Sequence, residues 1–285
     1  MSPLITKRLP MLLFVLSIAA GAQGQNQMLS PGPGRWTNSL GMIFVPVPGT
    51  QARFSIYETR VKDFEVFAAS KPKLDGTNWD HAFYHGTTPV STAGDDPVID
   101  VSWNDATNFC DWLTGMEQKS GKISTNESYR LPTDDEWSDA VGIGGRETGA
   151  TPKEKSAKLK EVYPWGTQFP PPPHAGNFAD QAALDYFTNW PHITNYDDGY
   201  VTTAPAGSFN ANQSGIYDLS GNAMEWCGDF YDASHKQRVL RGGAWINCGP
   251  KTLLSSYREH VSPERSSVAT GFRCVLDGQT APVEK

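Results

Sequence analysis

The chain has 285 residues, which suits one large domain or two small ones, and 38% of them are hydrophobic. The aromatic share is 11% and includes nine tryptophans, a composition that excludes a disordered chain. The formal net charge is -7, and this makes nucleic acid a poor partner because phosphate binding requires a basic face.

Residues 1–24 are predicted to be a signal peptide. Lys7 and Arg8 precede an apolar run over residues 12–20, and small residues that suit cleavage follow it. The run is shorter than the ~20 residues that span a bilayer, so a retained membrane anchor is the alternative interpretation. No other segment is apolar enough to span. The mature chain is therefore expected to be secreted or periplasmic, and to begin with a Pro/Gly-rich linker over residues 25–40.

Short elements are predicted next along the chain. Residues 41–61 alternate apolar and polar side chains around turn residues, which predicts two short strands. Residues 61–70 have helical spacing, with their phenylalanines on one face. A polar stretch rich in Gly and Pro over residues 71–96 is typical of a loop, and residues 97–103 resemble a short strand.

Two helices are predicted together with their ends. The first is expected to have Asn104 as its N-cap and to end at Gly121. The second is expected to have Thr133 as its N-cap and Glu136 three residues later, the pattern of a capping box. The three acids at residues 134–136 could form a catalytic carboxylate cluster, but acids in a first turn more often offset the helix dipole.

The second half of the chain is predicted to be largely irregular. Residues 143–203 show almost no periodicity, and a compact domain rarely holds so much irregular chain without metals, disulfides or buried tryptophans. Strand character returns at residues 238–247 and 271–277, and the sequence has no internal repeat. The fold class predicted is therefore α+β, a single loop-rich domain with little regular secondary structure.

Four cysteines raise the question of what their thiols do. In an oxidising compartment an even number favours disulfides, but four cysteines allow three pairings and spacing alone does not choose among them. The cysteines are Cys110, Cys227, Cys248 and Cys274. Cys248, in the segment that starts "RGGAWIN", could be a nucleophile, a metal ligand or half of a disulfide.

Several short stretches occur in an order that resembles the formylglycine-generating enzyme (sulfatase-modifying factor) family. They are "GMIFVPVPG", "PVIDVSWNDATNFCDWL", "YRLPTDDEW", "YPWG", "GNFAD", "GIYDLSGNAMEWCGDFYD", "RVLRGGAW" and "GFRCV". The resemblance implies one C-type lectin-like domain over residues 41–278, followed by a tail over residues 279–285. The founding activity of the family is an oxidase that uses copper and oxygen to convert a sulfatase cysteine into formylglycine.

The resemblance also implies two structural calcium sites. The first would use Asp218, the carbonyls of Gly221 and Ala223, and Glu225; the second would use Asn177, the carbonyl of Phe178, Asp198 and the carbonyl of Tyr200. A mixture of carboxylates and carbonyls on tight turns is what calcium requires. The alternative is that Asp218 and Glu225 only accept hydrogen bonds that close turns.

The copper oxidase chemistry of the family is expected to be absent. Two thiolates are needed after the GG turn, because soft ligands suit Cu(I). The matching positions hold Asn247 and Thr252, while Cys248 comes one residue late and would have Leu253 as its partner. Copper is therefore an unlikely cofactor, and Cys248 is only a weak candidate catalytic residue.

The resemblance pairs Cys110 with Cys274 as a disulfide. This pairing leaves Cys227 and Cys248, and a bridge between those two is the expected role of Cys248.

The stretch after the GG turn is expected to border a ligand groove. The groove residues would be Trp245, Asn247, Tyr257 and Arg258. Arg258 could bind a carboxylate or phosphate bidentately, or form an internal ion pair with Glu259 or another acid. The function expected is that of a secreted, calcium-stabilised binding or accessory module with an unknown protein, peptide or glycan ligand. The alternatives are a divergent metal-dependent oxidase and a lectin-like carbohydrate-binding module.

Overall fold

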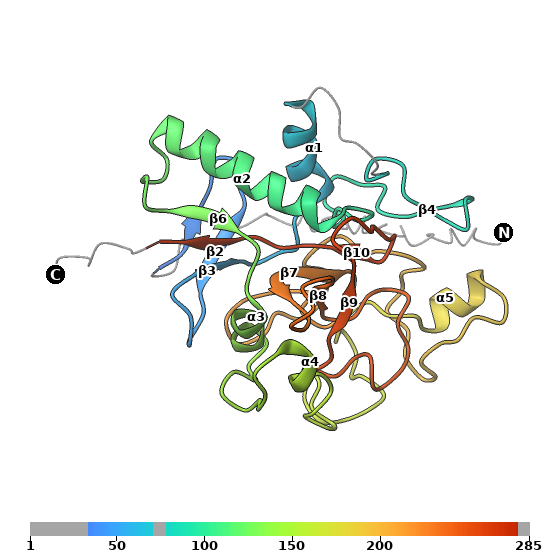
Figure 1. The fold of residues 1–285 in the computed structure, drawn as a ribbon. Coiled ribbons are helices and arrows are strands. Elements are labelled where there is room, and N and C mark those ends of the chain that lie inside the picture. The colour runs from blue at the N-terminus through green and yellow to red at the C-terminus, as the bar shows by residue number, and fades with distance from the viewer. Residues whose placement is uncertain (1–33, 71–77, 279–285) are drawn as a thin grey trace, which may run out of the picture. The chain divides into compact units, whose positions relative to one another are not determined.

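The computed structural model describes residues 34–70 and 78–278 (Figure 1). The predicted signal peptide, most of the predicted linker and the tail lie outside these residues. Within the described residues, no helix has the length and apolar character needed to cross a membrane.

A five-stranded antiparallel sheet joins the two ends of the described chain. Its strands are β1 (Trp36–Thr37), β2 (Ile43–Pro46), β3 (Arg53–Ser55), β11 (Val275–Asp277) and β6 (Ser128–Arg130), in this spatial order. The last strand, β11, is inserted between β3 and β6, and Val275 lies opposite both Phe54 and Arg130. Trp36 and Thr37 were predicted to lie in a linker, but their pairing with β2 makes them part of the domain.

Two helices pack beside this sheet (Figure 1). They are α1 (Val61–Ala69) and α2 (Trp103–Ser120), and their apolar faces meet in the main core, where the ring of Phe64 stacks on Phe109 at 5.8 Å. The N-cap of α2 is Ser102, whose hydroxyl accepts a hydrogen bond from the Asp105 N–H at 3.1 Å. The predicted N-cap Asn104 is thus wrong by two residues.

The predicted ends of the helices are otherwise close to the structure. Gly121 ends α2 in the left-handed region, at φ +73°, where glycine carries no steric penalty. Helix α3 (Asp134–Ala140) has Thr133 as its N-cap, and Glu136 completes the capping box as predicted.

The rest of the domain consists of short elements joined by ordered loops. A four-stranded sheet has the order β10 (Thr270–Gly271), β7 (Met224–Phe230), β8 (Arg238–Arg241) and β9 (Glu259–Val261), with β10 and β7 parallel. A small hairpin holds β4 (Phe83–Tyr84) and β5 (Thr88–Pro89). Between α3 and β7 the described elements are the short helices α4 (Pro152–Lys155) and α5 (Gln181–Tyr186), so the predicted irregular stretch is confirmed.

Two fully buried arginines fasten α3 to the segments around β8 and β9. Arg241 at the end of β8 donates to the Asp134 carboxylate at 2.5 Å, and Arg258 donates to the same carboxylate at 2.9 Å and to Glu147 at 2.7 Å. The hydroxyl of Ser138 accepts further bonds from both guanidinium groups. Burial opposes ionisation of Asp134, but the two arginines outweigh it and hold its pKa below the ordinary value. The stability that this carboxylate supplies is therefore present above its unfolded-state pKa and is lost as pH falls through the lower folded-state pKa.

We predict that Asp134→Asn lowers the free energy of unfolding by about 3 kcal/mol, because it leaves two buried guanidinium groups with one carboxylate. The matched control is Asp135→Asn in the same helical turn, where the carboxylate is 74% exposed and pairs with Lys155. The control is expected to change stability by less than about 1 kcal/mol. Urea denaturation followed by tryptophan fluorescence measures both, and equal effects of the two substitutions would contradict the prediction.

Candidate functional site

The turn that follows β8 is packed directly onto the segment before β7. At Gly243, a Cβ would lie 2.6 Å from a Leu253 methyl and 2.7 Å from the Ser220 carbonyl oxygen, so only glycine fits. The N–H of Trp245 donates to the Asn222 carbonyl at 3.0 Å, and its indole N–H donates to the Val268 carbonyl at 2.9 Å. The turn therefore has one rigid position, and Trp245 is 1% exposed beneath it.

The two positions expected for thiols hold residues that close the turn instead. The side-chain oxygen of Asn247 accepts a hydrogen bond from the Ala244 N–H at 2.8 Å. The hydroxyl of Thr252 donates to the Gly249 carbonyl at 2.9 Å. Neither residue carries the soft ligand that Cu(I) prefers, so the residues present do not fit a copper–thiolate pair.

In this structure Cys227 and Cys248 are both free thiols, and the predicted bridge between them is not formed. Cys227 is buried on β7 among residues around Trp137, whereas Cys248 is half-buried and packs against a different cluster around Phe178. Burial raises the pKa of the Cys248 thiol, and a raised pKa is the opposite of what activates a nucleophile.

The other two cysteines lie together, as the resemblance implied. The sulfurs of Cys110 on α2 and Cys274 are 3.5 Å apart and buried, but both are thiols. Their oxidation to a disulfide stays a prediction.

The residues expected to border a groove are not jointly open to a ligand. Trp245 and Arg258 are buried, and Arg258 pairs with Asp134 and Glu147 rather than with Glu259. Tyr257 is half-buried and donates its hydroxyl to Glu259 at 2.8 Å. Arg258 thus forms the internal ion pair that the sequence left open as the alternative, with acids more than a hundred residues away rather than with Glu259.

The first expected calcium region is a crowded group of buried carboxyls. Asp218 accepts a hydrogen bond from the Gly207 N–H at 2.6 Å with one oxygen, while its other oxygen is buried without a partner among the described residues. Burial, with a smaller contribution from the charge of Glu225, raises the pKa of Asp218 to about 6 against the opposing effects of the Gly207 N–H and Arg273. Glu225 itself is occupied, because Arg273 donates to it at 2.5 and 2.7 Å.

Glu58 belongs to the same group, although sequence reasoning missed it. It is buried next to β3 and accepts bonds from the Asn222 side chain at 2.7 Å and the Ala223 N–H at 2.9 Å. Burial, followed by the charges of Asp218 and Glu225, raises its pKa well above the ordinary value. Its place in a short apolar strand region gave no signal that its side chain turns inward.

The second expected region also combines an unpartnered oxygen with close carboxyls. The Asn177 side-chain oxygen is buried without a partner among the described residues, while its amide donates to the Thr202 carbonyl at 2.7 Å. Asp198 accepts bonds from the N–H groups of Phe178 and Tyr200 at 2.8 and 2.9 Å. Burial raises the pKa of Asp198 to about 8 despite these bonds, and the neighbouring Asp180 adds to the rise.

Asp180 is the second residue that sequence reasoning missed. It is fully buried and is the N-cap of α5, where one carboxylate oxygen accepts from the Ala182 and Ala183 N–H groups. The other oxygen accepts the Asp198 N–H at 2.5 Å. The stretch "GNFAD" contains it, and an Asp immediately before a helix was the signal available.

Both regions have the chemistry of a site for a hard cation. Each places a buried oxygen without a partner beside carboxyls whose pKa values burial raises, and a divalent cation with oxygen ligands would satisfy both. Within residues 34–70 and 78–278, no group of three or more His, Cys, Asp or Glu is arranged to hold a metal. A cation would therefore need amide and main-chain oxygens as well.

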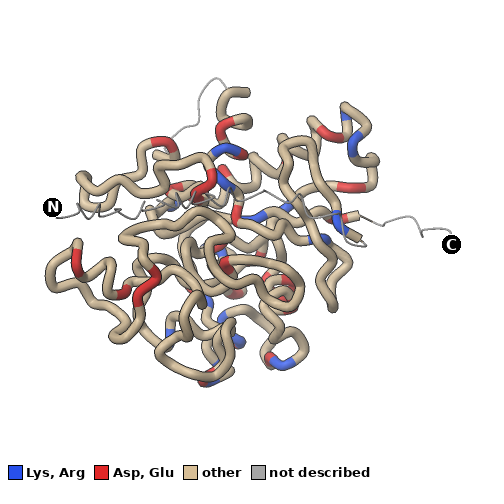
Figure 2. The backbone as a smooth tube through the Cα atoms, turned by 180° about the vertical axis from the view of Figure 1, so that it is seen from behind, with Lys and Arg blue, Asp and Glu red and all other residues tan. Residues whose placement is uncertain are grey.

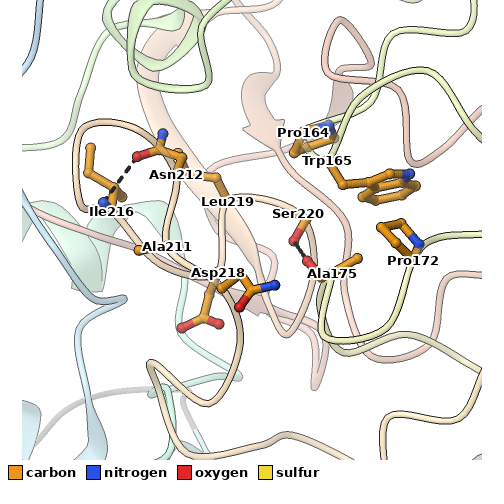
Figure 3. Close-up of a pocket in the computed structure, with 11 residues that line it drawn as sticks. Pro164, Trp165, Pro172, Ala175, Ala211, Asn212, Ile216, Asp218, Leu219 and Ser220 are labelled. Carbon is orange, nitrogen blue, oxygen red and sulfur yellow. Dashed lines mark hydrogen bonds between the residues drawn. The ribbon is translucent and has the colours of Figure 1, made fainter.

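A cavity of about 230 Å³ lies beside the first region (Figure 3). Figure 3 shows the rings of Trp165 and Pro172 on one side of it and Ile216 and Asp218 on the other. Ser220 donates to the Ala175 carbonyl at 2.5 Å across this cavity wall. The unpartnered Asp218 oxygen is not exposed to it, and so this oxygen points into the protein interior.

Comparison with known proteins agrees with this fold. Residues 24–278 match the sulfatase-modifying factor enzyme 1-like domain, and the chain belongs to this family. It is 30% identical over 202 residues to a formylglycine-generating enzyme of Streptomyces coelicolor, covering 64% of this chain and 52% of that protein. It is 31% identical over 198 residues to the inactive C-alpha-formylglycine-generating enzyme 2 of Bos taurus, covering 66% of this chain and 52% of that protein. The chain thus spans about half the length of these curated relatives.

Solved structures share the fold at lower sequence identity. PvdO from Pseudomonas aeruginosa has a TM-score of 0.55 at 17% identity, covering 87% of this chain and all of that one. Treponema denticola variable protein 1 has a TM-score of 0.52 at 18% identity, covering 86% and 99%. The predicted α+β fold of the formylglycine-generating enzyme type is confirmed.

We predict that alkylation without reductant labels Cys248 alone in the native protein, because the other three thiols are buried. In denaturant without reductant, Cys227 should also be labelled, since no bridge joins it to Cys248. Intact mass and peptide mapping measure the labels, with Cys248→Ser as the control. The opposite result would be that Cys227 and Cys248 are not labelled in denaturant but are labelled after reduction. That result would show that a disulfide joins them and would contradict the structure.

Proposed function

We propose that this chain is an exported, calcium-stabilised member of the family that lacks the copper oxidase site and acts as a binding or accessory module. The observation that carries the proposal is the pair Asn247 and Thr252 at the two thiol positions. Their polar groups are used to close the turn, as the bonds to Ala244 and Gly249 indicate. The similarity to a bovine relative named inactive, beside relatives named as enzymes, is compatible with this role.

Calcium is proposed to stabilise the long irregular stretch before β7. The unpartnered oxygens of Asn177 and Asp218, and the carboxyl pair of Asp180 and Asp198, support this part of the proposal. The Asn177 region is the better supported, because Glu225 in the other region is already paired with Arg273.

We expect the purified protein to bind no stoichiometric Cu(I) against a competing chelator and to leave a sulfatase cysteine peptide unchanged. Asn247→Cys combined with Thr252→Cys should create a copper site of about one equivalent, since two thiolates then flank the turn. The control is the same pair changed to Ser. Chelator competition and mass spectrometry of the peptide are the measurements. Conversion of the peptide by the unaltered protein would support the alternative, a divergent metal-dependent oxidase.

Calcium is expected to raise the unfolding temperature of the EDTA-treated protein by about 5 °C when it is in large excess over its dissociation constant. Asp198→Asn should raise stability in EDTA, because it relieves the pair with Asp180, and should abolish the response to calcium. Asp197→Asn, one residue away and exposed, is the matched control. Scanning calorimetry with calcium, magnesium and EDTA measures the shifts. An unchanged calcium response in Asp198→Asn would remove this site from the proposal.

A further inference from the structure

An aromatic patch covers the outer side of the buried Trp245. It consists of Tyr84, His85, Tyr186, Phe187 and Trp190. Its rings come from the β4–β5 hairpin and from the end of α5, segments that are about a hundred residues apart in the sequence. The ring of Tyr84 lies at its centre, 5.1 Å from Trp190, 5.5 Å from Phe187 and 5.4 Å from Trp245. The patch is thus built on the rigid turn that follows β8.

The backbone beneath the patch is held in place by hydrogen bonds. In the hairpin the Thr87 N–H donates to the Tyr84 carbonyl at 3.3 Å, and His85 and Gly86 both have positive φ, which matches a tight type I′ turn. After α5, the Trp190 N–H donates to the Phe187 carbonyl at 3.0 Å. Rings that are already ordered lose little conformational entropy when a ligand binds.

The polar ends of the outer rings have no partner among the residues that the structure describes. Tyr84, Tyr186 and Trp190 make no side-chain hydrogen bond to any described residue, and none of these polar atoms is buried. Tyr186 is 59% exposed. Six other tryptophans do donate their indole N–H to the protein: Trp36, Trp103, Trp137, Trp165, Trp226 and Trp245. The patch therefore combines apolar ring faces with donors and acceptors that remain available to a ligand.

The charge of the two segments that carry the patch disfavours anionic ligands. Residues 78–96 and 176–200, which carry the hairpin and α5, contain no Lys or Arg but several Asp. In Figure 2, the loops at the edge of the molecule where α5 lies carry acidic residues and no basic ones. A phosphate, sulfate or uronate would meet no counter-charge here and would be repelled by the carboxylates.

We infer that the aromatic patch binds a neutral saccharide chain, an inference that rests on the proposed role as a binding module. Sugar rings present apolar C–H faces to aromatic rings. Their hydroxyls accept from phenol O–H and indole N–H groups and donate to phenol oxygens. The ring of Tyr84 is nearly perpendicular to its neighbours, at 75° to Phe187 and 78° to Trp190, so the patch offers separate faces to successive sugar rings. A proline-rich peptide also docks on aromatic surfaces and offers carbonyl acceptors to the phenol and indole donors, but it has no hydroxyl to donate to the unpaired phenol oxygens.

The test titrates the full chain with neutral hexasaccharides built from glucose, mannose, xylose or N-acetylglucosamine, followed by calorimetry and tryptophan fluorescence. At least one is expected to bind, and Trp190→Ala is expected to weaken its binding by about tenfold. Tyr186→Phe removes only a hydroxyl and should weaken binding less. The matched control is Phe169→Ala, an exposed ring outside the patch, which should bind like the unaltered protein. Circular dichroism confirms that each variant is folded.

Three outcomes overturn the inference. The first is that no neutral hexasaccharide binds at millimolar concentration, and the second is that Trp190→Ala and Phe169→Ala bind alike. The third is that polyproline peptide binds through Trp190 while the saccharides do not, which would assign the patch to a protein partner. The titration uses neither copper nor thiols. The protein could therefore bind sugar and also convert the sulfatase peptide. That result would refute the proposed loss of oxidase activity and would leave the inference about the patch standing.

Discussion

The buried guanidinium of Arg273 is the contact on which the assembly of this domain depends. It donates to the Ser55 carbonyl on β3 at 3.1 Å, to the Tyr217 carbonyl at 2.9 Å and to Glu225 on β7 at 2.5 and 2.7 Å. These partners belong to the five-stranded sheet, to the irregular chain before β7 and to the four-stranded sheet. Glu225 also accepts the indole N–H of Trp137, so α3 is tied to the same carboxylate. A fully buried arginine is costly unless every partner is in place, and this makes the arrangement of both sheets cooperative.

The region around Arg273 contains more carboxyl groups than basic groups. Arg273 supplies one positive charge, whereas Glu58, Asp218 and Glu225 supply three carboxyls around it. Asn222 connects this group to the second acidic region, because it donates to Glu58 at 2.7 Å and accepts from Asn177 at 3.2 Å. A cation bound in either region would therefore order a network that reaches the other. This physical link is the reason we expect cations, rather than additional hydrophobic burial, to hold the irregular chain between α3 and β7.

Local features of the sequence predicted local features of the structure. The capping box at Thr133 and Glu136 and the glycine end of α2 depend on residues three or fewer positions apart, and both were found. The short two-residue strands and the partner of Arg258 depend on contacts between distant segments, which hydrophobic periodicity does not report. Glu58 and Asp180 were missed for the same reason, since an inward-facing acid in a strand region or at a helix start looks like a surface acid in the sequence.

The resemblance to the formylglycine-generating enzyme family predicted contacts between distant residues, which hydrophobic periodicity does not report. It placed Cys110 beside Cys274 and identified Asn177 and Asp218, whose unpartnered oxygens lie in buried positions. It also led to the bridge between Cys227 and Cys248, whose thiols pack in different clusters in this structure. That pairing joined the two cysteines left over, on the expectation that their segments are neighbours. Joining leftover cysteines is a weak argument where buried ion pairs already position the segments.

The turn after β8 is held in place independently of the residues at the two expected thiol positions. Gly243 and the Trp245 indole hold the turn in one position whichever residues come after it, so the thiol positions can become Asn247 and Thr252 without disturbing the fold. Under the proposed function the turn admits no substrate peptide and supports other loops instead. The β4 hairpin and the end of α5 rest on Trp245 through Tyr84 and Phe187. Loops on a rigid support are where new binding specificity arises most readily, which is why the aromatic patch is the part of this molecule where we look for its ligand.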